Sequence, residues 1–206
     1  MTPRRVLQLV LGCVVLGLGV SLLLGPSLGS DGYSTLVNGI AIAAGWPFVV
    51  ANLVVSAAFV ALAAVRRVRP GVGTVVQILV VGLVVQLTLP LMDPSALPAR
   101  IAMLVVAFPV ISVGIALYLD SGLGAGPAEG AALAWDPPVP FAWSYSAVQG
   151  GGALVGWQLG AAIGPGTIAV IVLLGPAVAL TGRALRLDLH QPGSHDDPVG
   201  TSPEPR

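Results

Sequence analysis

Two stretches of the chain, "RPGVGTVVQILVVGL" (69–83) and "IGPGTIAVIVLLG" (163–175), each place a Gly-x-Gly-Thr motif directly before a long apolar run. A glycine-rich turn that opens a helix can cradle a phosphate, but such a loop needs a strand before it and usually a Lys after it. Here Val75 and Ile168 follow the threonines. We therefore expect two tight turns between apolar helices, each with a threonine that caps the second helix. Their residues are Gly71, Gly73 and Thr74 in the first turn, and Gly164, Gly166 and Thr167 in the second.

The composition indicates a protein that lies in a bilayer. Of the 206 residues, 55% are hydrophobic and 9% are charged, whereas soluble domains carry about 25% charged residues. The formal net charge is zero, so no overall positive field attracts nucleic acid. We expect no cofactor and no metal, because the sequence holds no ATP-binding motif and both histidines lie in the last 20 residues.

Six apolar stretches are long enough to be membrane spans, since about 20 such residues cross about 30 Å of hydrocarbon. They are Val6–Leu24, Trp46–Val65, Val72–Leu89, Ile101–Leu119, Trp143–Ile163 and Thr167–Leu185. Two further apolar pieces, Ser34–Ala44 and Ala128–Trp135, are too short to span. They are either re-entrant half-helices or helices that lie in the interface.

The chain repeats itself. Four anchors recur in the same order in both halves, at offsets of 95 and then 93: Gly19 with Gly114, Leu28–Gly29 with Leu123–Gly124, Pro47–Phe48 with Pro140–Phe141, and the two Gly-x-Gly-Thr motifs. Each copy holds three spans and one short segment. Because three is odd, the second copy crosses the membrane in the opposite direction, as in the inverted repeats of many secondary transporters.

The predicted fold is thus an all-α polytopic membrane protein with six transmembrane helices in two inverted three-helix repeats, each with a short non-spanning helical segment. The repeats are residues 1–95 and 96–186, and residues 187–206 form a polar, proline-rich disordered tail. Arginine placement sets the orientation: with both termini in the cytoplasm, only Arg100 of the arginines near the spans lies outside.

Several motifs resemble a known family. They are "GLGVSLLLGPSLGSDG", "RPGVGTVVQILVVGL", "GIALYLDSGLGAGP", "LVGWQLGAAIGPGT" and "LLGP". Together they resemble the YczE/YyaS/YitT family of bacterial integral membrane proteins, closest to the YczE branch, up to about Ala179. The resemblance implies a multi-spanning, transporter-like protein of the bacterial inner membrane, without a known reaction.

The chain departs from that family at two places. Where the YczE branch has Arg-Asp-Gly-Leu-Met, residues 128–132 read "AEGAA". Where family members carry an Arg and then a Glu in the fifth span, this chain reads "SYSAVQGGG". An activity that used an intramembrane Arg–Glu pair is therefore not expected here.

Glu129 is the most informative ionisable residue, because a carboxylate at membrane depth is costly and tends to mark a functional path. Either it begins the second short helix and contacts a cation or substrate, or it lies in an interfacial loop in water. Asp31 and Asp120 lie close to predicted span ends, where we expect them at the interface.

Uncharged polar residues within the spans are further candidates for a substrate site: Asn52, Gln77, Tyr145 and Gln149. Such side chains either form hydrogen bonds between helices or line a cavity. Glycines 150–152, 156 and 160 favour a close helix crossing. Pro109 and Pro176 should kink their spans.

These features favour a small-solute transporter or permease-like protein with a site between the repeats. The alternative is a non-transporting accessory or regulatory protein that packs against other membrane proteins. An enzyme is not expected, because no span holds His or Asp and no catalytic motif is present. The expected partners are the lipid bilayer, a small-molecule solute, and a membrane protein or second copy of the chain.

Overall fold

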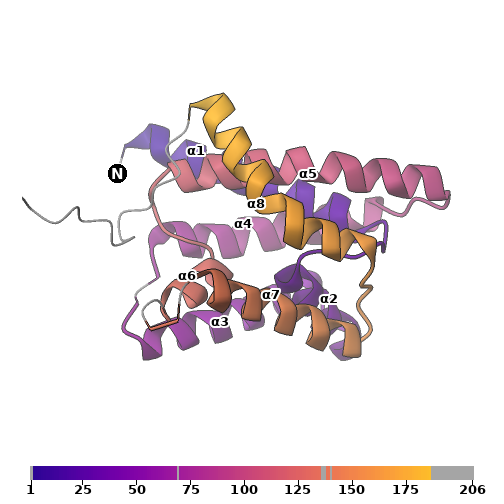
Figure 1. Ribbon diagram of the computed structural model, residues 1–206, viewed down its shortest axis with the longest axis horizontal. Coiled ribbons are helices and arrows are strands. Elements are labelled where there is room, and N and C mark those ends of the chain that lie inside the picture. Colours follow the sequence, from indigo (N-terminus) through magenta and orange to yellow (C-terminus); the bar gives the residue numbers. More distant parts are fainter. Residues whose placement is uncertain (1, 69, 136–137, 140, 187–206) are drawn as a thin grey trace, which may run out of the picture.

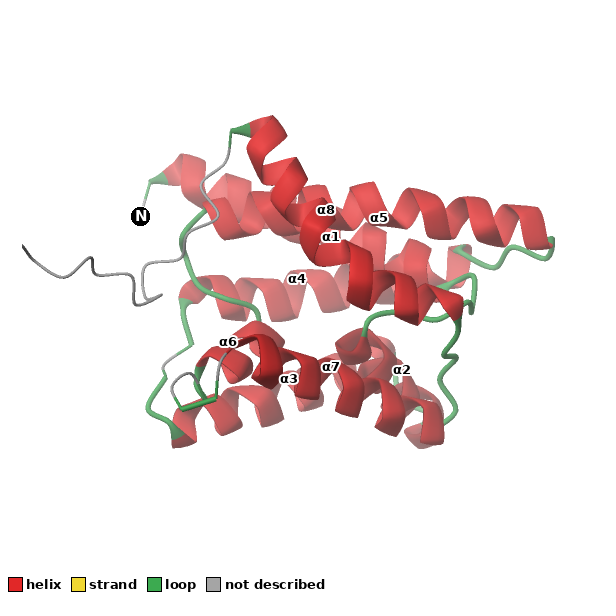
Figure 2. Cartoon of the chain, in the orientation of Figure 1, coloured by secondary structure: helices red, strands yellow, loops and turns green. Residues whose placement is uncertain are grey.

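The computed structural model describes residues 2–68, 70–135, 138–139 and 141–186. Within these ranges the secondary structure is helical, without a strand (Figure 2). The helices are α1 (Pro3–Leu24), α2 (Gly32–Ala44), α3 (Phe48–Val65), α4 (Val72–Thr88), the 3-10 turn η1 (Leu89–Leu91), α5 (Leu97–Asp120), α6 (Pro127–Leu133), α7 (Phe141–Gln158) and α8 (Pro165–Leu185). The predicted tail, with its two histidines, lies outside the described residues.

Every predicted span coincides with a helix, but not every one of these helices passes as a span. Four are long and apolar enough to cross a membrane by themselves: α1, α3, α5, and α4 continued through η1. The fifth, α8, is bent by 46° between Leu174 and Pro176 and qualifies if its two parts form one span. The remaining helix, α7, does not qualify, because polar side chains and glycines interrupt its apolar sequence.

The two internal prolines behave differently. The predicted kink is present at Pro176 in α8. In contrast, α5 continues as one helix through Pro109 from Leu97 to Asp120. A proline always removes one backbone hydrogen bond, and neighbouring residues decide how far the helix then bends. The second proline directly follows Gly175, a residue of low helix propensity.

The helices form two layers (Figure 1). One layer contains α1, α4, α5 and α8, and the other contains α2, α3, α6 and α7. Within the first layer, α1 packs along α5, α4 packs on α1, and α8 packs on α5. Within the second layer, α2 packs on α7, and α3 packs on α6. Each layer therefore contains segments from both halves of the chain.

Glycines allow the closest of these contacts. A Cβ at Gly114 of α5 would lie 2.5 Å from the backbone nitrogen of Leu16 in α1. A Cβ at Gly39 of α2 would lie 2.5 Å from the carbonyl oxygen of Gly156 in α7. Both distances are shorter than a carbon atom allows, so these crossings require glycine.

The close crossing predicted for the glycine-rich part of α7 involves only some of its glycines. Gly152 and Gly156 pack against the backbone of α2. Gly150 and Gly151 are exposed, and a Cβ at either would meet nothing within 4 Å. Gly160 follows the helix with a φ of +99°, a conformation that favours glycine.

Candidate functional site

A central cavity of about 80 Å³ lies where the two halves of the chain meet. All eight α-helices contribute lining residues. All five polar candidates from the sequence line it: Asn52, Gln77, Glu129, Tyr145 and Gln149. Sequence reasoning did not identify three further polar residues in the lining, Asp31, Tyr33 and Ser34.

Tyr33 and Asn52 form the centre of a hydrogen-bond network on one side of the cavity. The Tyr33 hydroxyl donates to Asn52 Oδ1 over 3.0 Å and lies 2.7 Å from the hydroxyl oxygen of Ser56. The Asn52 Nδ2 group donates to the carbonyl oxygen of Ile78 over 2.9 Å. Asn52 therefore does both things considered for it, since it joins α3 to α4 and also lines the cavity.

Gln149 connects α7 to the beginning of α2. Its Oε1 atom accepts a hydrogen bond from the Tyr33 backbone N–H over 3.1 Å, and its Nε2 group donates to the Tyr145 hydroxyl over 2.8 Å. This close approach depends on Gly32, because the Gln149 backbone carbonyl occupies the place where a Cβ of residue 32 would stand. Gln149 is 8% exposed, so its hydrogen bonds are shielded from water.

Asp31, which the sequence places near a predicted span end, lines the central cavity. Its Oδ2 atom accepts a hydrogen bond from the Ser34 backbone N–H over 2.9 Å, which makes it the N-cap of α2. An aspartate directly before a helix is a recognised capping signal, so the sequence contained the information that places it. Burial raises the pKa of the Asp31 carboxyl, and hydrogen bonds from the Ser34 backbone oppose the rise.

Asp120 ends α5 and contacts α1. Its Oδ2 atom accepts a hydrogen bond from Gln8 Nε2, and the same amide group donates to the carbonyl oxygen of Leu117 over 3.4 Å. Asp120 is not part of the central cavity lining. Its role in the structure is to join two long helices near their ends.

Glu129 lies in the first turn of α6, partly buried, and lines the cavity. Burial raises the pKa of its carboxyl group, and the nearby charge of Asp31 adds to the rise. A raised pKa means that this group takes up and releases protons closer to neutral pH than an exposed glutamate does.

Gln77 of α4 adds an unsatisfied acceptor beside Glu129. The side chain is 9% exposed, and its Oε1 atom has no hydrogen-bond partner among the described residues. Glu129 Oε2 and Gln77 Oε1 both lie within 2.5 Å of the point where a Cβ of Gly126 would stand, so they are at most about 5 Å apart. A buried amide oxygen without a partner costs roughly 1–3 kcal/mol, so this oxygen marks a place where a donor group is missing.

The central cavity combines acceptors with aromatic rings and contains no basic side chain. Among the described residues that line it there is no Arg, Lys or His. No group of three His, Cys, Asp or Glu residues in the described ranges is arranged to hold a metal ion. The acceptors of the cavity are therefore suited to binding a molecule through its N–H or O–H groups.

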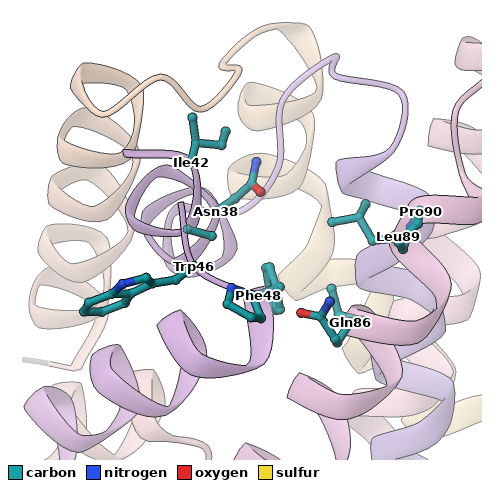
Figure 3. A pocket seen from close by; sticks show the side chains of 10 residues that line it. Asn38, Ile42, Trp46, Phe48, Gln86, Leu89 and Pro90 are labelled. Atoms are coloured by element: carbon teal, nitrogen blue, oxygen red, sulfur yellow. The ribbon is translucent and has the colours of Figure 1, made fainter. Parts of the chain in front are cut away.

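A second, more open pocket of about 260 Å³ lies where α2 meets α3 and α4 ends (Figure 3). Asn38, Trp46 and Gln86 are among its lining residues. Phe48, which is 7% exposed, lines both this pocket and the central cavity. One aromatic side chain thus stands between the two spaces.

The two Gly-x-Gly-Thr motifs reach across to the opposite half of the chain. The Gly73 N–H donates to the carbonyl oxygen of Leu123 over 2.8 Å, and the Gly166 N–H donates to that of Leu28 over 2.9 Å. Each motif therefore holds the loop that precedes the short helix of the other half.

The threonine of each motif lies inside the first helical turn, and the N-cap is the first glycine of the motif, Gly71 or Gly164. Thr74 Oγ1 accepts from the Gly71 N–H over 3.2 Å, and Thr167 Oγ1 accepts from the Gly164 N–H over 3.5 Å. In addition, the Thr74 hydroxyl donates to the carbonyl oxygen of Ala125 over 2.7 Å. Each threonine thus bonds back to the N-cap glycine, and Thr74 also bonds to the other half of the chain.

Comparison with known proteins finds a match to one protein family and one distant relative. Residues 3–183 match a family described as "Family of unknown function (DUF6198)". The chain is 28% identical, over 167 residues, to an "Uncharacterized protein" of Haemophilus influenzae, and this match covers 80% of the chain and 77% of the relative. No solved structure matches the chain.

Proposed function

The chain belongs to the DUF6198 family, whose description names no activity, and we propose that it is a small-solute membrane transporter with its binding site in the central cavity. The observation that carries this proposal is that polar side chains from both halves of the chain line one cavity between apolar, membrane-capable helices. Buried polar groups within a membrane are costly and tend to mark a solute path. The chain would act as a secondary carrier, because it has no ATP-binding motif.

The arrangement of α2 and α6 supports this assignment. Residues from the first turns of both short helices line the cavity, and α2 and α6 lie toward opposite ends of their layer (Figure 1). Half-helices that begin near the membrane midplane and run toward opposite faces are characteristic of transporter sites. In this proposal both segments are re-entrant rather than interfacial.

We also propose the inverted repeat and six spans. Exchanging the two halves converts the α1–α4 contact into the α5–α8 contact, and the α2–α7 contact into the α6–α3 contact; all four occur. The reciprocal hydrogen bonds of the Gly-x-Gly-Thr motifs support the same relation. In this arrangement α7 is also a span, the fifth along the chain, and its polar residues are explained by the cavity that they line. The predicted kinship with the YczE/YyaS/YitT proteins belongs to the same proposal.

The proposed orientation places both termini in the cytoplasm of a bacterium, with the protein in its inner membrane. The N-terminal end of α1 and the C-terminal ends of α3 and α8 lie at one end of the molecule, and α5 begins at the other end (Figure 1). The first group of helix ends carries most of the arginines, whereas Arg100 belongs to α5. Arginine accumulates on the cytoplasmic side, which favours this orientation over its opposite.

The pocket beside Trp46 would then be an entrance from the outer side, with Phe48 as the barrier between entrance and site. The alternative function, an accessory protein that packs against other membrane proteins, is favoured by one feature only. At Gly150 and Gly151, a part of α7 is open, with no described residue outside α7 within 4 Å of where a Cβ would stand. A protein that acts only by packing has no need of a polar cavity, so transport explains more of the structure.

The test of transport uses the full chain in proteoliposomes and follows vesicle swelling after addition of small polar solutes, including urea, glycerol, amino acids and amidinium chloride salts. We expect at least one solute to enter faster than into protein-free vesicles. Replacing Phe48 by Ala should change that rate, whereas replacing the exposed Gly151 by Ala should not. Equal rates for the whole panel with and without protein would contradict the proposal.

A further inference from the structure

We infer that the central cavity selects a small organic cation that carries N–H donors, of the ammonium or amidinium type. This inference names the substrate class of the proposed transporter and rests on that function for its physiological meaning. Its physical basis is the binding site itself, which can be tested without any measurement of transport.

The first support is the sign of the charge in the cavity. Asp31 and Glu129 both line it, and no described lining residue carries a positive charge. An anionic solute would have to approach two carboxyl groups in a space that holds no counter-charge, and like charges at close range repel strongly. A cation would instead complete a charge pair inside the membrane, which is how buried carboxylates are stabilised.

The second and independent support is the unsatisfied oxygen of Gln77. This side chain is nine-tenths buried and lines the cavity, and no group in the described part of the chain bonds to its Oε1 atom. It lies beside Glu129 Oε2, so two acceptors face the same small volume. A solute with at least two N–H groups would satisfy both oxygens together, and donors bound to a charged group make the stronger hydrogen bonds.

The remaining lining agrees with an organic cation. The rings of Tyr33, Phe48 and Tyr145 line the same cavity, and aromatic faces attract ammonium and guanidinium-like groups. A divalent metal fits less well, because hard cations require about six oxygen ligands and the described residues hold no cluster of three acidic or other metal-binding side chains. A volume of about 80 Å³ limits the solute to a few non-hydrogen atoms, since a water molecule occupies about 30 Å³ in the liquid.

Three compounds with the same four-atom skeleton test the charge directly: acetamidinium, acetamide and acetate. They are a cation, a neutral molecule and an anion of nearly identical shape. Binding is measured by calorimetry on the full chain in lipid nanodiscs, at constant ionic strength. We expect acetamidinium to bind at least about tenfold more tightly than acetamide, as for a charge-assisted hydrogen bond, and acetate not to bind.

The variants separate recognition from stability. Glu129→Gln and Gln77→Leu should each weaken acetamidinium binding by about tenfold or more. Gln77→Leu should not lower the thermal unfolding temperature, because it removes a buried oxygen that has no partner. The matched control Asp93→Asn removes an exposed carboxylate outside the cavity and should leave binding unchanged. Equal binding of acetamidinium and acetamide, preferred binding of acetate, or sodium binding more tightly than acetamidinium would overturn the inference.

The same preparations distinguish this inference from the transport proposal. In proteoliposomes, binding of acetamidinium without carriage of any solute of the panel would support the cation site and contradict transport. Swelling with another solute, in a protein that does not bind acetamidinium, would support transport and overturn the cation site. Carriage of acetamidinium that is lost in Glu129→Gln and retained in Asp93→Asn would support both.

Discussion

The two short helices occupy equivalent places in the chain but use their acidic residues differently. Asp31 stands just before α2, and its carboxylate already accepts a backbone N–H of the first turn. Glu129 stands inside the first turn of α6, whose N-cap residue Gly126 provides no side-chain hydrogen bond. One carboxylate therefore caps its helix, whereas the other does not cap and lines the cavity in which we propose that a solute binds.

The two ends also differ in how they are packed. α2 has 13 residues and lies against the backbone of α7 through glycines. α6 has 7 residues and lies against α3, where Arg66 donates to the carbonyl oxygen of Ala134 over 3.2 Å and stands over the Trp135 ring. The α2 end is therefore held by close backbone contact, and the α6 end partly by side chains.

Breaking the α2–α7 crossing should have the largest effect. A Cβ at Gly156 would lie 2.5 Å from the carbonyl carbon of Thr35, so Gly156→Leu forces the helices apart. We expect a loss of about 3 kcal/mol or more in the free energy of unfolding, measured by thermal unfolding in detergent. Gly151→Leu, five residues earlier in the same helix and exposed, should leave it nearly unchanged. A similar loss in both variants would show that the crossing is not as described.

The second largest effect should be that of pH on the binding of acetamidinium. Burial raises the pKa of both Glu129 and Asp31, so each carboxyl is more protonated near neutral pH than an exposed one. Raising the pH removes these protons and should strengthen acetamidinium binding by up to about tenfold per pH unit for one coupled proton. The titratable groups around Glu129 are Asp31, Tyr33, Tyr118 and Tyr145.

The same shift has a defined consequence for stability. A carboxyl whose pKa is raised by folding binds protons more tightly in the folded protein, so the folded state gains stability at low pH. That gain is lost as the pH rises from the ordinary carboxyl pKa through the raised one.

Calorimetric titrations between pH 5 and pH 8, with the Glu129→Gln variant as the control, measure the pH dependence of binding. Binding that weakened as the pH rose would contradict the assignment of the acidic groups.

Substitutions that remove either the charge or the helix cap should distinguish Asp31 from Glu129. The expected changes in the free energy of unfolding are smaller than for the helix crossing. Asp31→Ala removes the N-cap of α2 and should cost about 1 kcal/mol, whereas Asp31→Asn keeps the cap and should cost only a few tenths. Glu129→Ala should cost less than Asp31→Ala, because no cap is lost. Thermal unfolding of the three variants measures this order, and equal losses for Asp31→Ala and Glu129→Ala would contradict the proposed difference.

The smallest expected effect is at the α6 end. Arg66→Gln removes the contact with the Trp135 ring and should lower the free energy of unfolding by about 0.5 kcal/mol, as for an exposed cation–π pair. The neighbouring Arg67 lies over no aromatic ring of the described residues and provides the control as Arg67→Gln. A loss as large as that of Asp31→Ala would mean that side chains hold the α6 end more firmly than backbone contacts suggest.

The sequence predicted the helices better than the relations among them. Apolar length indicated each of the eight α-helices in the described ranges, with ends that differ by at most five residues, because the bilayer demands long apolar segments. It also identified Asn52, Gln77, Glu129, Tyr145 and Gln149, since polar residues are rare in such segments. Asp31 was not recognised as a lining residue because its position at the end of an apolar run resembled an interfacial one. Tyr33 was missed because a tyrosine near a span end is typical of the aromatic belt.

Some features depended on three-dimensional contacts that no local pattern contains. Gly150 and Gly152 lie in the same glycine run, but only Gly152 is on the side of α7 that packs against α2. The unpartnered oxygen of Gln77 likewise depends on how closely α4 approaches Gly126. The sequence pattern shows where polar residues lie along a helix. The neighbouring helices decide which of these polar groups find a hydrogen-bond partner.

The exchange of hydrogen bonds between the Gly-x-Gly-Thr motifs and the opposite loops has a mechanical consequence. Gly73 holds the chain that leads to α6, and Gly166 holds the chain that leads to α2. A displacement of α4 would therefore pull on the loop that carries Glu129, and a displacement of α8 would pull on the loop that carries Asp31. The position of each acidic residue therefore depends on a helix of the opposite half, so movements of the two halves should be coupled.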